Sequence, residues 1–67
     1  MAKVEVYGKD ELKPLFEGDF TFIPRMGETI SKDAGGYFDY YTVVEIWHRE
    51  EGEMGTFCAC VRVEIDD

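Results

Sequence analysis

Apolar and polar residues alternate near the end of the chain. From Phe57 to Ile65 every second residue is apolar, and cysteines or charged residues stand between them. A period of two is typical of a strand that buries one face. The run from Tyr40 to His48 is rich in the aromatic and β-branched residues that suit a pleated surface. With EEGEMG as a loop of about four residues, the pattern predicts one long β-hairpin over residues 37–65.

The facing of the apolar residues predicts the register of this hairpin. Pairing Glu50 with Gly55 sets His48 opposite Phe57 and puts the even-numbered residues of the first strand on the buried face. The outer face then carries Tyr41, Val43, Glu45, Trp47, Cys58, Cys60, Arg62 and Glu64. Glu45 and Arg62 become near neighbours there, as an ion pair that contributes little when exposed.

This predicted outer face is unusually apolar for a strand surface in water. One explanation is that the N-terminal segment, or closure of a barrel, covers part of it. The other is a surface for a partner or for a homodimer, because contiguous exposed apolar patches mark contact sites. The candidate contact residues are Tyr41, Val43, Trp47, Cys58, Cys60 and Arg62, with an acidic rim of Glu50, Glu51 and Glu53 in the hairpin loop.

The rest of the chain reads as short strands and turns. Lys3–Tyr7 alternates as a strand, residues 11–17 form an irregular or edge-strand return, and Gly18-Asp19 is a turn signal. The run FTFIP at 20–24 ends at a proline, and a tight turn leads into a strand over 28–31. Four to six short strands without a helix predict an all-β fold, a small barrel with a dominant C-terminal hairpin.

The order of these elements resembles SH3-like barrel domains. The resemblance rests on a Pro-x-x-Gly-Glu-x-Ile turn from Pro24 to Ile30, a Gly-rich loop, a Tyr-Tyr-x-Val-Val-x-Ile strand and a final Val-Arg-Val-Glu strand. Small bacterial and bacteriophage proteins of uncharacterised function share this layout. The resemblance covers residues 20–65. It implies an SH3-like barrel of antiparallel strands and a bacterial or phage source, and it implies no catalytic or binding residue.

Length and charge narrow the function. Sixty-seven residues make one domain, which buries only about 60% of its unfolded surface. Seven Lys and Arg against fifteen Asp and Glu give a net charge of −8. Such a charge repels nucleic acid and anionic membranes and favours a basic protein partner. The start of the chain lacks the apolar run of a signal peptide, and two cysteines two residues apart on a strand do not easily bridge. We therefore expect reduced thiols and a cytoplasmic protein.

The candidate chemical groups do not assemble into a site. Cys58, Cys60 and His48 offer three zinc ligands, but the predicted register puts the histidine on the opposite face and a fourth ligand is missing. The same facing separates a Cys–His nucleophile pair. Carboxylates in the hairpin loop lie in water rather than in a cleft. We expect no catalytic residue, no metal and no cofactor.

Three functions remain from the residues alone. The first is a non-enzymatic protein-binding module that uses the outer hairpin face, where Trp47→Ala is expected to weaken binding and spare the fold. The second is an inhibitor that mimics nucleic acid, with Asp10, Glu11, Glu17, Asp19, Glu50, Glu51 and Glu53 in place of phosphates. The third is an aromatic cage for a basic peptide, built from Tyr37, Asp39, Tyr41 and Trp47.

Overall fold

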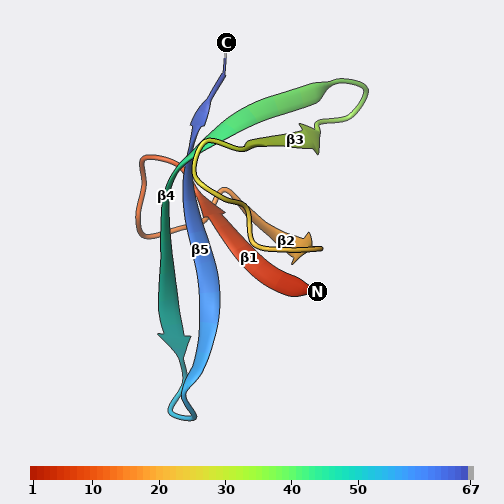
Figure 1. Cartoon of the computed structure of the whole chain (residues 1–67). Coiled ribbons are helices and arrows are strands. Elements are labelled where there is room, and N and C mark those ends of the chain that lie inside the picture. Colours follow the sequence, from red (N-terminus) through yellow and green to blue (C-terminus); the bar gives the residue numbers. More distant parts are fainter. Residues whose placement is uncertain (67) are drawn as a thin grey trace.

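The computed structural model describes residues 1–66 and contains five strands. They are β1 (Ala2–Tyr7), β2 (Phe16–Phe20), β3 (Thr29–Asp33), β4 (Phe38–Glu51) and β5 (Thr56–Ile65). The strands form one strongly curled sheet, a half-barrel (Figure 1). Residues 1–66 contain no helix, so none there has the length and apolarity needed to cross a bilayer. The all-β prediction with a dominant C-terminal hairpin is confirmed.

The strand order is β2-β1-β5-β4-β3, and three of the four pairings are antiparallel. The exception is β1 beside β5, which is parallel, with Val4 opposite Ala59 and Val6 opposite Val61. The prediction of a wholly antiparallel sheet was wrong in this pairing. Hairpin neighbours must run in opposite directions, but β1 and β5 are joined by most of the chain, which leaves their relative direction free.

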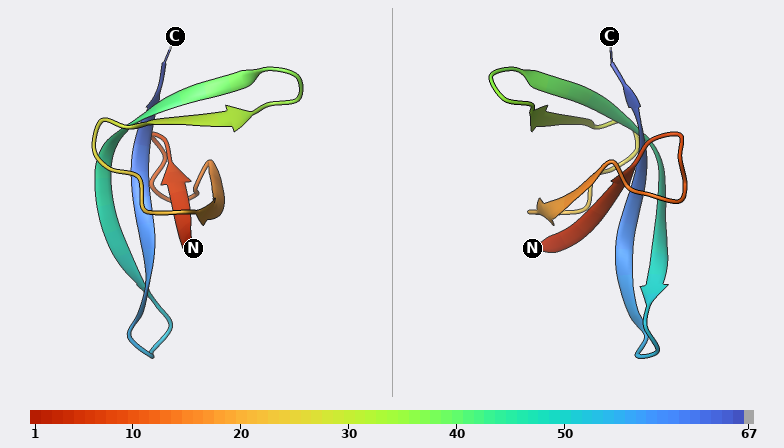
Figure 2. Two further views of the ribbon diagram at one scale, coloured as in Figure 1. Left: turned by 45° about the vertical axis from the view of Figure 1, so that its right-hand side comes forward. Right: turned by 180° about the vertical axis from the view of Figure 1, so that it is seen from behind.

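The core lies on the concave face of the sheet. Its fully buried residues include Val4, Val6, Val43 and Val61, and the predicted inward facing of Val4 and Val6 is confirmed. Partly buried side chains complete this core: Ala2, Phe16, Phe20, Ile23, Ile30 and Ile46. The linker over residues 21–28 joins β2 to β3 across the concave side (Figure 2). On the other face of β1 and β5, the side chains of Glu5, Tyr7, Cys58 and Cys60 are buried as well.

The hairpin between β4 and β5 closes with four residues, as predicted. Gly52 and Gly55 stand at the two ends of the loop with φ of 68° and 72°, a left-handed conformation that glycine adopts without strain. The strands therefore end at Glu51 and Thr56, which pair. The predicted register was wrong by two residues in this half, since His48 lies opposite Ala59. A shift of two preserves the facing of each side chain.

A β-bulge at Val44 reverses the facing in the other half of the hairpin. Val43 pairs with Val63 while Glu45 pairs with Arg62, so one extra residue lies in β4. Tyr41 and Val43 consequently face the core, with 8% and 1% of their surface exposed. The prediction that both lie on the outer face was wrong, because apolar residues at 41, 43 and 46 share one face only with an inserted residue between them.

The linker explains how the bulge is held. The N–H of Gly27 donates to the carbonyl of Val43 at 2.8 Å, and the N–H of Val43 donates to the carbonyl of Glu28 at 2.9 Å. Gly27 has a φ of 84°, so the predicted tight turn at this glycine is confirmed. The predicted turn at residues 18–19 was wrong, since both lie inside β2.

Candidate functional site

The convex face of the sheet, opposite the core, brings together part of the predicted contact surface. Trp47 lies opposite Cys60 and Glu45 opposite Arg62, so Trp47, both cysteines and Arg62 share one face. The two cysteines are nevertheless only 4% and 0% exposed. The prediction that they lie on an open surface was wrong, because β1 runs alongside β5 and its Glu5 lies against the thiol of Cys60. The N-terminal segment therefore covers part of this face, as the first of the two explanations predicted.

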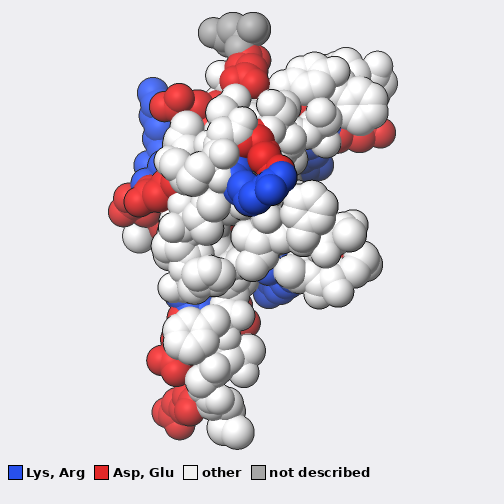
Figure 3. Space-filling model, in the orientation of Figure 1, with Lys and Arg blue, Asp and Glu red and all other residues white. Residues whose placement is uncertain are grey.

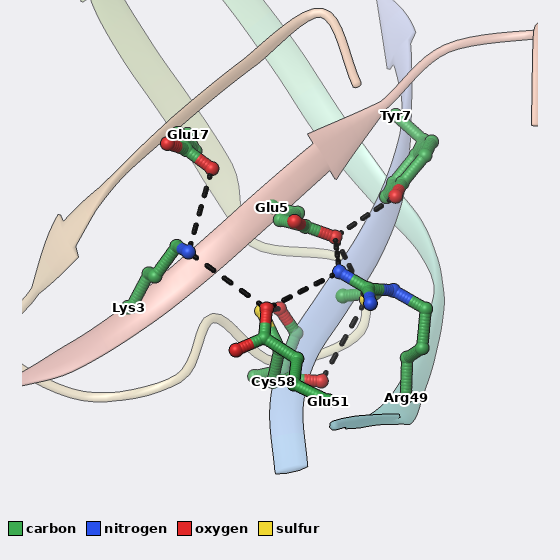
Figure 4. Close-up of polar contacts among 9 residues, drawn as sticks. Lys3, Glu5, Tyr7, Glu17, Arg49, Glu51 and Cys58 are labelled. Atoms are coloured by element: carbon green, nitrogen blue, oxygen red, sulfur yellow. Dashed lines mark hydrogen bonds and ion pairs between the residues drawn. The ribbon is translucent and has the colours of Figure 1, made fainter. Parts of the chain in front are cut away.

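A buried carboxylate lies at the centre of the convex face. Glu5 is 7% exposed and accepts hydrogen bonds from Nη2 of Arg49 at 2.7 Å and from the hydroxyl of Tyr7 at 2.8 Å (Figure 4). The thiol of Cys60 lies 3.6 Å from the same oxygen. The hydrogen bond from Arg49 lowers the pKa of Glu5, against the effect of its burial. Glu5 is therefore an ionised carboxylate in the sheet, with its partners gathered at Oε1.

Weaker ion pairs extend this cluster toward the edge of the sheet. Lys3 lies 3.8 Å from both Glu17 and Glu51, and Glu51 also lies 3.4 Å from Arg49. These side chains are well exposed, so each pair contributes little to stability.

Arg62 anchors the other side of the convex face. It forms the predicted ion pair with Glu45, a second one with Glu11 at 2.8 Å, and it donates to the carbonyl of Gly8 at 3.2 Å. Its guanidinium also lies over the ring of Trp47, 5.3 Å from the centroid. Trp47 in turn packs on Tyr7, with ring centroids 5.3 Å apart. The side chains that the sequence placed on an exposed apolar face are thus largely packed against, or bonded to, other residues of the same chain.

The buried cluster contains three groups that metals use as ligands. One oxygen of Glu5 and the sulfurs of Cys58 and Cys60 all lie within 4.8 Å of one another. Burial raises the pKa of Cys58, and burial with the nearby Cys58 and Glu5 raises that of Cys60 to about 11. Both thiols are therefore neutral at pH 7, and Arg49 already supplies the cation beside Glu5. The arrangement is that of a packed polar core.

The structure predicts unreactive thiols. Below about pH 8.5 the thiols are neutral in both the folded and the unfolded chain, and their burial is fully compatible with the fold. This stabilisation is lost as the pH rises through about 11, the pKa of Cys60 in the folded protein. We expect a chromogenic disulfide reagent at pH 8 to react roughly a hundredfold more slowly with the native chain than with the urea-unfolded chain. Urea unfolding at pH 7, 9 and 10.5 should show falling stability. Equal reaction rates of native and unfolded protein would contradict this burial.

The other candidate residues lie apart from this cluster. His48 is exposed and faces away from the cysteines, which confirms the predicted separation. Glu50, Glu51 and Glu53 lie at or beside the tip of the hairpin, where Glu51 is bound to two cations. The predicted aromatic cage does not form, because the bulge puts Tyr41 and Trp47 on opposite faces. Tyr41 packs on Phe16, with ring centroids 5.8 Å apart, whereas Tyr37 is 64% exposed and Asp39 lies opposite Lys32.

The second surface of interest is the open side of the half-barrel, between its two edge strands. Strands β2 and β3 are not paired with each other, and side chains alone approach across the gap, as where Lys32 lies 5.2 Å from the ring centroid of Phe16. A groove of about 300 Å³ lies there, which we call the seam groove. Its lining residues are Phe20, Thr21, Phe22, Pro24, Glu28, Thr29, Ile30 and Ser31.

The seam groove is largely apolar and open to solvent. Phe22 is 60% exposed, and Phe20 and Ile30 extend from the core into the groove walls. In Figure 3, uncharged residues dominate the surface over β2, while acidic side chains gather over β4 and the tip of the β4–β5 hairpin. Sequence reasoning missed this surface because it treated FTFIP at 20–24 as one run that ends at Pro24, whereas β2 ends at Phe20 and Phe22 lies in the linker.

A larger groove of about 550 Å³ lies on the other side of the bulge. Leu15, Val44 and Ile65 supply its apolar wall, and Arg62 and Lys9 its positive charge. The guanidinium of Arg62 is already bound by two carboxylates and a carbonyl. The guanidinium in this groove is therefore already engaged within the chain.

Comparisons of the chain with protein-family models, curated proteins and solved structures gave no match. The resemblance to SH3-like barrels therefore stays a prediction, and function has to be argued from these surfaces.

Proposed function

We propose that the protein is a non-enzymatic binding module that contacts a protein partner through the open side of its half-barrel. One observation carries this proposal: an apolar groove lies between the edge strand β3 and the segment where β2 ends and the linker begins, and both edge strands have an unpaired side. Exposed apolar surface beside unpaired strand edges is unfavourable in water and is typical of contact sites. The aromatic residue at the rim, Phe22, is a suitable anchor for such a contact.

The chemistry of the partner follows from charge. The chain carries a net charge of −8, and Glu17, Asp19, Glu28 and Asp33 lie on or beside the strands that border the seam. Of the cations nearby, Arg25 is bound by Glu28 at 2.8 Å, and Lys32 lies over the ring of Phe16. A basic partner surface therefore gains from electrostatic attraction, while two copies of this chain repel each other.

The contact surface proposed here differs from the one predicted from the sequence. Trp47 and Arg62 satisfy each other and their neighbours on the convex face, and the cysteines beside them are buried. A partner would have to break these contacts to bind there. The seam groove demands no such rearrangement, because Phe22 and Met26 beside it are already more than half exposed.

Replacing Phe22 by serine tests this proposal. We expect the variant to keep its fold, since the side chain lies in water, and to lose about tenfold in affinity for the partner captured from the source organism's lysate. Leu12→Ser is the matched control, because Leu12 is 91% exposed on a loop away from the seam. Binding would be measured by titration of the purified partner. Equal loss in both variants, or no capture by the wild type, would contradict the proposal.

A salt series separates this function from mimicry of nucleic acid. Of the seven carboxylates considered for a mimic, Glu11, Glu17 and Glu51 are engaged in ion pairs within the chain. Their charge is partly neutralised, which favours the apolar contact over the mimic. Salt screens the attraction of the basic partner but leaves the apolar part of the contact, so the proposed contact loses only part of its affinity, whereas a mimic that binds through charge alone loses affinity steeply.

A further inference from the structure

The hydrogen bonds between β3 and β4 determine which main-chain groups of β3 point to its outer edge. The N–H of Ala34 donates to the carbonyl of Tyr37 at 2.8 Å, so these residues form a hydrogen-bonded pair of the β3–β4 ladder. Such pairs alternate in antiparallel strands, so Ile30 and Lys32 direct their main-chain groups toward β4. The groups of Thr29, Ser31 and Asp33 then point to the open edge. On the other side of β4, the carbonyl of Tyr40 accepts from Asp66 at 2.9 Å, which agrees with this alternation.

The seam groove lies directly beside this edge. Thr29, Ile30 and Ser31 form one wall of the groove, and Phe20 and Phe22 belong to the other. A strand added to β3 would lie about 4.8 Å away, over the groove. Its side chains would alternate, one set directed into the groove and the other toward water. The groove favours apolar residues in the first set.

Charge determines which residues suit the second set, the side chains of the added strand that point toward water. The edge strands β2 and β3 hold three carboxylates, Glu17, Asp19 and Asp33, against one cation, Lys32, and the chain as a whole is strongly acidic. Lys or Arg on the solvent side of an added segment would be attracted, and Asp or Glu would be repelled. A second copy of this chain would bring its own net charge of −8 to the contact. A basic segment is therefore the occupant that the charges favour.

We propose that the outer edge of β3 binds an extended, basic segment of a partner protein as an additional strand, with apolar side chains at alternate positions in the seam groove. This inference rests on the proposed protein-binding function and specifies the mode of contact and the chemistry of the segment. Main-chain hydrogen bonds to Thr29, Ser31 and Asp33 provide the affinity, and the groove selects the side chains.

A proline at position 31 tests the mode of contact. The N–H of Ser31 points outward, so Ser31→Pro removes a donor at the edge and leaves the β3–β4 ladder intact. Ser31→Ala keeps the donor and is the control. The probe is a short peptide of alternating lysine and valine, blocked at both ends and titrated to millimolar concentration into isotope-labelled protein. We expect amide shifts at Thr29, Ser31 and Asp33, affinity at least about tenfold weaker for Ser31→Pro, and no change for Ser31→Ala.

A second measurement uses the wild-type protein and does not depend on the fold of a variant. Two forms of the peptide carry N-methyl groups on alternate amides, one form for each edge of the extended chain. Strand addition uses one edge only, so one form should bind like the parent and the other at least about tenfold more weakly. A peptide with glutamate in place of lysine should bind more weakly than both. Equal binding of the two methylated forms, or no shifts at β3 with the parent peptide, would overturn the proposal.

The variants also separate this inference from the proposed function. If Phe22→Ser loses the captured partner and Ser31→Pro keeps it, the protein binds partners at the seam but not by strand addition. If neither variant loses the partner, the seam is not the contact surface and both proposals fail. If the wild type dimerises in sedimentation and Ser31→Pro does not, the occupant is a second copy, which overturns the assignment to a basic segment.

Discussion

Replacing Arg49 by methionine is expected to destabilise the fold strongly at pH 7. The apolar stem of the side chain is kept, but the cation 2.7 Å from Glu5 is lost. Glu5, which is 7% exposed, then keeps a carboxylate with only the hydroxyl of Tyr7 and the thiol of Cys60 beside it. An ionised carboxylate buried in this way costs about 2–3 kcal/mol, a large share of the stability of so short a domain. Urea unfolding measures the loss.

The pH dependence identifies Glu5 as the cause. In the wild type the pKa of Glu5 is lowered, so its contribution is present above about pH 4.5 and is lost as the pH falls through the lower, folded value. Without Arg49 burial is the largest remaining cause, opposed by the hydrogen bonds from Tyr7 and Cys60, so the pKa of Glu5 rises and we expect the variant to gain stability when the pH falls from 7 to 5. Over the same pH interval Glu5 should not change the free energy of unfolding of the wild type. A variant that is no more stable at pH 5 than at pH 7 would contradict the role assigned to the pair.

Two further variants serve as controls for this pair. Glu5→Gln removes the buried charge, and Arg49 can turn into water because its side chain is 43% exposed, so the loss should be smaller than for Arg49→Met. Lys3→Met removes a cation whose two carboxylates lie 3.8 Å away and in water, and it should have little effect. Similar losses for all three changes would mean that overall charge, not the buried pair, controls stability.

Replacing Trp47 by alanine is expected to lower the free energy of unfolding by about 2 kcal/mol. The half-buried indole packs on Tyr7, supports the guanidinium of Arg62 and lies opposite the buried Cys60. From the sequence alone this change was expected to weaken binding and spare the fold, and the observed packing reverses that expectation. Thermal and urea unfolding give the loss, and faster reaction of Cys60 with thiol reagents gives an independent measure.

Phe57→Ala is the matched control for Trp47. Phe57 belongs to the same hairpin but is 61% exposed, so its removal should cost much less. Trp47→Phe keeps an aromatic ring on Tyr7 and should lie between the two. If Trp47→Ala unfolds at the same urea concentration as Phe57→Ala, then the tryptophan is a surface residue in solution.

Local patterns predicted the strands and loops well where the cause lies in neighbouring residues. The alternation from Phe57 to Ile65 defines β5, and glycines 52 and 55 take the positive φ that closes the hairpin. Gly27 sets the turn before β3 in the same way. Each of these depends on the covalent geometry of a few consecutive residues, so an isolated stretch of sequence contains the information.

The bulge at Val44 could not be predicted from local sequence patterns. The stretch YYTVVEIW is apolar or aromatic in both alternating sets, so either set could face the core. The choice is made by Gly27 and Glu28, whose main-chain groups bond to Val43 from a distant part of the chain. That choice put Tyr41 and Val43 in the core and removed both from the predicted contact surface.

The amino-acid sequence by itself determined the all-β class, the long C-terminal hairpin and the strongly negative charge, because these follow from local alternation, turn residues and a count of ionisable groups. The tertiary structure decided the rest. The parallel placement of β1 beside β5 buries the two thiols and joins Glu5 to Arg49 across 44 residues of chain. The curl of the sheet also leaves β2 and β3 unpaired beside an apolar groove. Pairing between segments far apart in the chain depends on the free energy of the whole sheet, and no single segment encodes it.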